Sequence, residues 1–391
     1  MSDDDQQLAQ IPMSTIVREW TRLGVIGFGG PPTHIALLRR RCVEERQWIS
    51  EHDFEDGIAT TNLLPGPAST QLAIYCAWRL RGILGGLIGG LCFVIPGLIL
   101  ILALSVVFLA SDPPAWVLGA AAGAGSAVPA IALSAAWGLV PGSRHRIGEA
   151  RSDQFRWSVY FVLGALVAAL VGPFLVLLII ACGALEVVIR QKGTGVGQRS
   201  MASIVPTVVL PAAVIGGLGA LSWVAFKVGA LSYGGGFVII PMMQHDAVTT
   251  YHWMTAAQFL NAVALGQITP GPVVQTVAVV GYAAGGIAGG LLAAAIAFGP
   301  SFVFVLSDAR HFDQIRTNAK VQSFLTGAGP TVIGAIAGSA VPLGLAFGHL
   351  WQVPVLLGAG LWLFVARRSV VSALLICGAL GIVLALCGVP V

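Results

Sequence analysis

Charged residues are scarce in this chain. Only 10% of its 391 residues are Asp, Glu, Lys or Arg, whereas soluble globular domains carry about 25%. Hydrophobic residues make up 56%, and the mean hydropathy is +0.86. A chain so poor in charge cannot cover a soluble surface, and helices satisfy their own backbone groups in lipid. We therefore predict an all-α polytopic membrane protein, in which the 50 glycines serve close helix packing.

Motifs of enzymes and metal sites are also missing. The sequence has no Walker A loop and no H-E-x-x-H motif, which argues against direct ATP drive and against a zinc hydrolase. Its six cysteines form no C-x-x-C pair and are expected to pack as small apolar residues. The net charge of +4 comes from short clusters between apolar runs, not from a nucleic-acid-binding surface. We expect no enzyme activity, no cofactor and no metal.

Glycine and proline instead interrupt apolar segments in a repeated pattern. Residues 27–32 read Gly-Phe-Gly-Gly-Pro-Pro, and residues 64–67 read Leu-Pro-Gly-Pro. Gly29 and Gly66 recur 205 positions later, as Gly234 and Gly271, in similar motifs. These residues break helices inside apolar runs. Interrupted segments at matching positions of two halves indicate the binding site of a transporter.

The repeat divides the chain into four parts. Residues 1–22 form an N-terminal interfacial segment, 23–189 the first repeat, 190–202 a cytoplasmic linker, and 203–391 a connecting span followed by the second repeat. The connecting span, at 203–222, makes the number of crossings between the repeats odd, so we predict inverted topologies. We expect about 10–13 membrane segments in total.

Charge placement favours broken segments that are re-entrant. The loop 39–53 contains four arginines, whereas its counterpart 244–258 contains no Lys or Arg. The first is then cytoplasmic and the second external. With re-entrant segments every Lys and Arg except Lys227 falls on the cytoplasmic side, whereas full crossings would place Arg79 and Arg81 outside.

A helix that restarts at mid-membrane points free N–H groups and its positive dipole end inward, and such an end binds anions. Arg22 and Lys227, which are repeat equivalents, could add positive charge, and nearby hydroxyls and amides could donate hydrogen bonds. The alternatives are a simple kink, snorkelling to the headgroups, and hydrogen bonds between helices. The predicted substrate-binding residues are Arg22, Gly29, Gly30, Asn62, Pro65, Gly66, Pro67, Ser69, Thr70 and Gln71 in the first half, and Lys227, Tyr233, Gly234, Gly235, Gln267, Thr269, Pro270, Gly271, Pro272 and Gln275 in the second.

Proton coupling requires a titratable group, and three residues are candidates. His34 and His245 follow the first break of each half, and histidine titrates near neutral pH. Asp53 precedes the second break, but the corresponding residue of the other half is Gln258. A role for this carboxylate would therefore be confined to one half.

At these motifs the chain resembles the chromate ion transporter family in its long form, with two fused homologous halves. The resemblance rests on residues 27–35, 45–48 and 64–71, and in the second half on 226–229, 232–236, 240–241 and 267–272. It implies export of chromate across the cytoplasmic (inner) membrane, driven by the proton-motive force and conferring chromate resistance. It also implies that sulfate, a similar tetrahedral dianion, competes. The alternatives are a transporter of sulfate or another oxyanion, and an uncoupled anion channel; a homodimer is left open.

Overall fold

The computed structural model describes residues 11–61, 64, 66–110, 112–148, 150–170, 174–193, 217–232, 239–308 and 318–391. Every regular element in these ranges is helical. Four helices are long and apolar enough to cross a membrane, namely Ala68–Phe108, Ala115–Ile147, Val273–Ser307 and Ala319–Leu345. The predicted all-α polytopic membrane fold is thus confirmed.

The elements of the first repeat are α2 (Met13–Ile26), α3 (Pro31–Arg39), η1 (Arg40–Glu45), α4 (Glu51–Thr61), α5 (Ala68–Phe108), α6 (Ala115–Ile147), α7 (Arg151–Leu170) and α8 (Leu175–Gly193). Those of the second are α9 (Leu218–Leu231), α10 (Ile240–Gln244), η3 (His245–Thr250), α11 (Ala256–Ile268), η4 (Val273–Gln275), α12 (Thr276–Asp308), α14 (Ala319–Leu345), α15 (Gln352–Gly360), η5 (Leu361–Val365) and α16 (Val370–Leu386).

The two repeats agree in backbone detail. Both contain a π-helix at the same place, η1 and η3, whose first residues are 40 and 245. Each π-helix is followed by a non-glycine residue with positive φ, Gln47 at 49° and His252 at 53°. The loop 39–53, predicted as irregular, is therefore helical as far as Glu45.

The second broken segment of the first repeat is re-entrant. Arg79 Nη2 lies 2.9 Å from Asp53 Oδ2, so the chain leaves through α5 beside the place where it entered through α4. It then reverses at Arg81 and Gly82, where φ at Gly82 is 61°, and runs back over residues 83–108. A methyl group at Gly89 would lie 2.4 Å from the Ala77 side chain, so the two arms of α5 are antiparallel and closely packed. Gly285 and Gly286 make the same reversal in α12.

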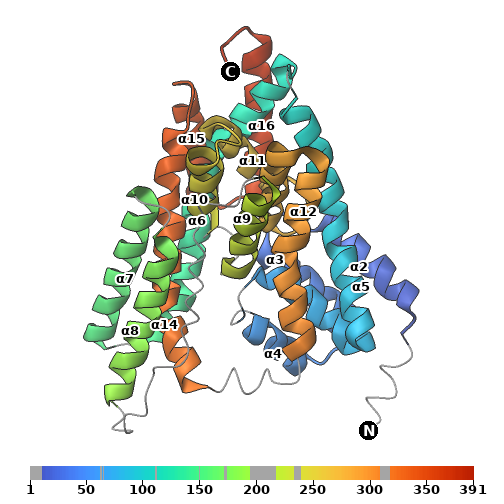
Figure 1. Ribbon diagram of the computed structural model, residues 1–391, viewed down its shortest axis with the longest axis vertical. Coiled ribbons are helices and arrows are strands. Elements are labelled where there is room, and N and C mark those ends of the chain that lie inside the picture. The colour runs from blue at the N-terminus through green and yellow to red at the C-terminus, as the bar shows by residue number, and fades with distance from the viewer. Residues whose placement is uncertain are drawn as a thin grey trace.

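The repeats point in opposite directions. In Figure 1, α4, α7 and α8 lie toward the lower end of the molecule, and their counterparts α11, α15 and α16 lie toward the upper end. Helix α4 lies at the lower end, and its residues Glu51 and Asp53 pair with Arg39 and Arg79, so we call this end the basic end.

The terminal hairpins are exchanged between the repeats. Helices α7 and α8 pack mainly against α14, and α16 and α15 pack against α6 (Figure 1). Each hairpin therefore belongs to one repeat by sequence and to the other by packing. The repeats are consequently not two separate bodies.

Glycines make this exchange possible. Methyl groups at Gly334 and Gly338 of α14 would lie 1.9 and 2.2 Å from the carbonyl oxygens of Phe161 and Ala165 on α7. A methyl group at Gly123 of α6 would likewise lie 2.2 Å from the carbonyl oxygen of Cys377 on α16. Glycines four residues apart let helix backbones touch in lipid, where dispersion rather than the hydrophobic effect drives association.

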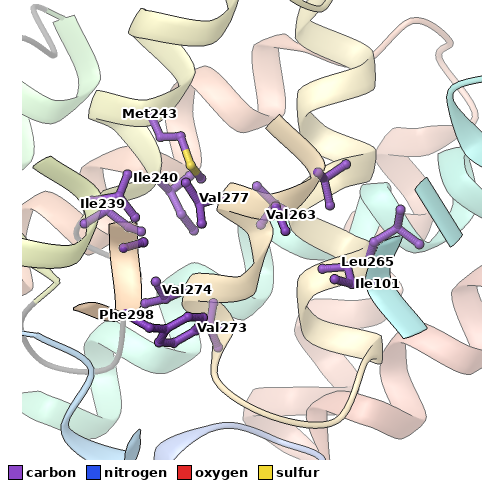
Figure 2. Close-up of a cluster of buried hydrophobic side chains, with 14 of the residues drawn as sticks. Ile101, Ile239, Ile240, Met243, Val263, Leu265, Val273, Val274, Val277 and Phe298 are labelled. Atoms are coloured by element: carbon purple, nitrogen blue, oxygen red, sulfur yellow. The ribbon is translucent and has the colours of Figure 1, made fainter. Parts of the chain in front are cut away.

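The apolar core gathers where the breaks meet. Figure 2 shows Ile101 of α5, Ile240 and Met243 of α10, Val263 of α11 and Phe298 of α12, with their neighbours, all buried. This core holds the interrupted helices of the second repeat against the long helix of the first.

One predicted boundary is wrong. We expected the connecting span to end at residue 222, but α9 runs without interruption from Leu218 to Leu231. Residues 200–216 lie outside the described part of the chain.

Candidate functional site

The first break of one half meets the second break of the other. The backbone N–H of Gly271 donates to the carbonyl oxygen of Gly27 at 2.8 Å. A methyl group at Gly30 would find only Val273, at 3.8 Å. Gly29 and Gly30 have φ of 99° and 78°, so the chain turns sharply just before α3 begins at Pro31.

The two Pro-Gly-Pro turns pack reciprocally against the long helices of the opposite repeat. A methyl group at Gly66 would lie 2.8 Å from Ser301 Oγ of α12 and 2.5 Å from Gln71 Nε2. One at Gly97 of α5 would lie 2.0 Å from the Pro270 carbonyl oxygen and 2.5 Å from Gln275 Oε1. Residues 71 and 97 correspond to 275 and 301 at an offset of 204, so the two arrangements are repeat equivalents.

Polar groups without protein partners surround these turns. Ser69, Thr70 and Ser301 are at most 1% exposed, and their hydroxyl oxygens have no hydrogen-bond partner among the described residues. Gln275 Nε2 donates to the Val94 carbonyl at 2.9 Å, which leaves Oε1 without a partner there. Buried hydroxyls and amides normally find partners, so these groups beside the two backbone breaks are available to bind water or a polar ligand.

Further predicted residues of the second half are buried around the turn at Gly271. Thr269 Oγ1 donates to the Leu265 carbonyl at 2.9 Å, and Pro270 and Pro272 are buried in the turn around Gly271. Gln267 is 5% exposed, and its Nε2 makes no hydrogen bond within the described residues. In the first half Pro67 is buried directly before α5, and it is the N-cap of that helix.

His34 lies at the centre of the contact between the halves. It is 1% exposed, and its Nε2 lies 2.8 Å from the Gly27 carbonyl oxygen. Since a carbonyl only accepts, Nε2 carries the proton and a neutral ring has its lone pair on Nδ1, which has no partner among the described residues. One carbonyl thus accepts from both the imidazole and the Gly271 N–H.

The two predicted cations do not lie free beside the breaks. Arg22 is exposed on α2. Lys227 Nζ is 2.5 Å from Asp246 Oδ2 and lies over the Trp223 ring. Lys227 is thus neutralised by Asp246, and Arg22 lies on an exposed surface, so the expectation of one free cation from each half finds no support here.

Asp53 and His245 have local roles. Asp53 Oδ2 accepts from Ser50 Oγ at 2.8 Å, and Ser50 Oγ accepts from the Asp53 N–H, so Asp53 stabilises the start of α4. Its counterpart Gln258 forms a capping box with Thr255 at the start of α11, which accounts for the one-sided carboxylate. His245 is half-buried in η3. The predicted residues Asn62, Pro65, Tyr233, Gly234 and Gly235 lie outside the described residues.

A carboxylate at the basic end is buried with arginines. Glu19 of α2 is 2% exposed and accepts from Arg41 Nε at 2.9 Å and from Arg41 Nη2. Burial opposes its ionisation, but the hydrogen bonds and charge of Arg41 outweigh that effect and hold the pKa of Glu19 below its usual value. The pair joins α2 to η1 just as Lys227 and Asp246 join α9 to η3, with the signs reversed.

The sequence prediction missed Ser301. Its equivalent in the first half is Gly97, and the offset between the halves changes from 205 to 204 after the Pro-Gly-Pro turn. Aligning the Pro96-Gly97 and Pro300-Ser301 pairs would have revealed it, since both are prolines inside long apolar helices.

Comparison with known proteins gives a consistent result. The chain is 34% identical over 336 residues to the chromate transport protein of Cupriavidus metallidurans, which is 84% of this chain and 82% of that protein. It is 30% identical to the chromate transport protein of Pseudomonas aeruginosa over 90% and 93% of the two chains. The uncharacterized transporter YwrB of Bacillus subtilis matches at 28% identity over 92% of its own length but only 47% of this chain, so it has about the length of one repeat. No solved structure matches.

The model of the chromate transporter family matches residues 14–187 and 219–382, which are the two repeats described above. The first match begins in α2 and ends in α8, and the second begins in α9 and ends in α16. This chain therefore belongs to the chromate transporter family.

Proposed function

We propose that the protein is a secondary active exporter of chromate in the cytoplasmic membrane, coupled to protons and conferring chromate resistance. Membership of the chromate transporter family and two relatives named as chromate transport proteins support the substrate. The basic end then faces the cytoplasm, following the positive-inside rule.

The reciprocal packing of the two Pro-Gly-Pro turns is the observation that carries the proposal. It brings Gly66 beside Ser301, and Gly97 beside Gln275, at equivalent places in the two repeats. Hydroxyls, amides and helix N-termini can donate to the four oxygens of a tetrahedral oxyanion without a formal positive charge. We assign the anion to the space around these turns.

His34 is the group that we assign to proton coupling. His34 is buried at the contact between the repeats, and its Nδ1 has no partner among the described residues, so we assign it the proton that moves inward in the half of the cycle in which chromate is absent. Nε2 is bonded to the same carbonyl that accepts from Gly271. Protonation at His34 therefore acts directly on the contact between the repeats.

The two ends of the molecule are packed differently, which supports alternating access. At the upper end α11 packs against α6, and a methyl group at Gly125 would lie 2.9 Å from Asn261 Oδ1. The equivalent positions at the basic end are Gly329 of α14 and Asp56 of α4. A methyl group at Gly329 would meet only Ser143 Oγ within 4 Å, at 3.7 Å. Among the described residues, α4 has no contact with α14 comparable to that of α11 with α6. We infer a conformation closed at the upper end and open at the basic end.

Radiolabelled chromate and sulfate uptake into inside-out vesicles tests the function. A proton-coupled exporter accumulates chromate when a pH gradient is imposed, saturates, and takes up sulfate more slowly. Equal rates without the gradient, driven by membrane potential alone, would identify an anion channel. Faster sulfate than chromate uptake would identify sulfate as the transported anion.

The variant His34→Gln tests the coupling residue separately. Glutamine can still donate to the Gly27 carbonyl but cannot be protonated. We expect at least a tenfold smaller response of chromate uptake to the pH gradient, with chromate still bound. An unchanged response would remove His34 from the coupling mechanism and leave the substrate assignment intact.

A further inference from the structure

A cavity lies between α15 and α16, and none of its lining residues belongs to the Pro-Gly-Pro turns. Its volume is about 440 Å³, within the range of about 300–1,000 Å³ typical of ligand pockets. The two helices contact each other little because each packs on α6, and they leave a groove between them. Its lining is almost entirely apolar and includes Val355, Ala359, Ala373 and Cys377.

Tryptophans mark both ends of this groove. Trp351 and Trp362 both line it and are 11 residues apart. At a rise of 1.5 Å per residue they are separated by roughly 16 Å, which matches one leaflet, about 15 Å or half of the hydrocarbon core. The groove therefore has the length of an acyl chain.

Two arginines close one end. The N–H of Arg368 donates to the Trp362 carbonyl at 3.1 Å, so the turn containing Arg367 and Arg368 directly follows the wall of the groove. Both arginines are exposed, and neither is in an ion pair within the described part of the chain. Because α16 runs from this turn toward the C-terminus at the upper end (Figure 1), the arginines lie at the groove end nearer the basic end.

We propose that this groove is a binding site for one anionic phospholipid. Its acyl chain lies between α15 and α16, and its phosphate pairs with Arg367 and Arg368. Arginine binds phosphate oxygens through two parallel N–H bonds, and long basic side chains extend from apolar surface to the headgroups. This lipid would fill the space that the exchanged hairpin leaves open.

Native mass spectrometry of the full-length protein in detergent tests the site, with phosphatidylglycerol and phosphatidylcholine of identical acyl chains as probes. We expect one phosphatidylglycerol to be retained at least tenfold more tightly than phosphatidylcholine. R367Q/R368Q should abolish this preference. The matched control R146Q/R151Q, which removes two exposed arginines elsewhere, should preserve it.

A second pair of variants tests the groove itself. A methyl group at Gly358 meets nothing within 4 Å, and neither does one at Gly360, but only Gly358 lines the cavity. Gly358→Leu should therefore displace both phosphatidylglycerol and phosphatidylcholine, whereas Gly360→Leu should displace neither. The two variants should have equal melting temperatures, because neither position has an atom within 4 Å of an added methyl group. Equal retention of the two lipids by the wild type, or retention in Gly358→Leu, would overturn the proposal. So would a dimer in detergent that Gly358→Leu converts to monomer without loss of lipid, because the groove would then bind a second copy.

Discussion

Gly66 and Gly271 adopt a backbone conformation that other residues reach only with strain. Their φ angles are 126° and 106°, and each lies beside a buried glutamine of the following helix, Gln71 or Gln275. A side chain would both strain the turn and occupy the space in which we place the anion. Two effects therefore act at each position, and they can be separated.

Gly66→Ala should lower the rate of chromate uptake at least tenfold with little change in membrane yield, because its methyl group would lie 2.8 Å from Ser301 Oγ. Gly82→Ala is the matched control. Gly82 has φ of 61°, and a methyl group there meets nothing within 4 Å, so this variant introduces positive-φ strain of about 1–3 kcal/mol without filling the site. Equal loss of transport in the two variants would mean that backbone strain alone explains the effect.

Helical elements are joined by ion pairs whose charges are reversed between the repeats. Glu19 and Arg41 connect α2 to η1, and Lys227 and Asp246 connect α9 to η3. Residues 41 and 246 are repeat equivalents, so an arginine in one half stands where the other has an aspartate. The re-entrant arms are thus fastened by electrostatics in both halves although the residues differ.

The Glu19 pair predicts a pH dependence of stability. Because the pKa of Glu19 is lowered from 4.5 in the folded protein, its ionised form stabilises the fold at pH values above about 4.5. That contribution is lost as the pH falls from there toward the lowered pKa. Melting temperatures in detergent between pH 7 and pH 3.5 should therefore decline less in Arg41→Gln than in the wild type. Arg40→Gln, which affects only the exposed Glu45, should decline as the wild type does.

Close glycine contacts fix the exchanged hairpins. A methyl group at Gly334 of α14 would lie 1.9 Å from the Phe161 carbonyl, so Gly334→Leu must push α7 away from α14. We expect a large loss of folded protein, measured as the monodisperse yield in detergent. Gly344→Leu, on the same helix but with nothing within 4 Å, is the control. A normal yield of Gly334→Leu would show that this contact is not needed.

At the scale of the whole molecule, the exchange of hairpins changes which parts can move together. The helices α6 and α14 with the hairpins α7–α8 and α15–α16 form one packed group drawn from both repeats. Helices α2 and α4 pack on α5, and α9 packs on α12, which in turn packs on α5, whereas α11 packs mainly on α6. The alternating access that we propose would then be a movement between these two mixed groups, rather than rocking of one repeat against the other.

Cysteine pairs can measure this movement. G125C/N261C should cross-link in the conformation described here and block chromate uptake, because α6 and α11 are in contact at the upper end. D56C/G329C, the equivalent pair at the basic end, should cross-link only when that end closes, and chromate together with a pH gradient should increase its yield. Full transport by cross-linked G125C/N261C would exclude the movement.

The sequence alone determined the membrane class, the two repeats and the position of the breaks, because low charge and interrupted apolar runs leave few other structures possible in lipid. It also predicted Gly66, Gly271 and Gln275 as site residues, since each recurs or lies beside a recurring motif, and the structure places them at the packed turns. Comparison of the two repeats could also have predicted that Asp53 stabilises the start of α4. Ser50 and Asp53 align with Thr255 and Gln258, which form a capping box at the start of α11.

Only the tertiary structure decided which helices pack together. Hydropathy is the same on every face of an apolar helix, so it does not predict that α7 packs against α14. Nor does it predict that Asp246 pairs with Lys227, 19 residues away in the sequence. The re-entrant geometry likewise followed from the contact between Asp53 and Arg79. In a bilayer these choices depend on close steric fit and paired charges, and both appear only when the chain has folded.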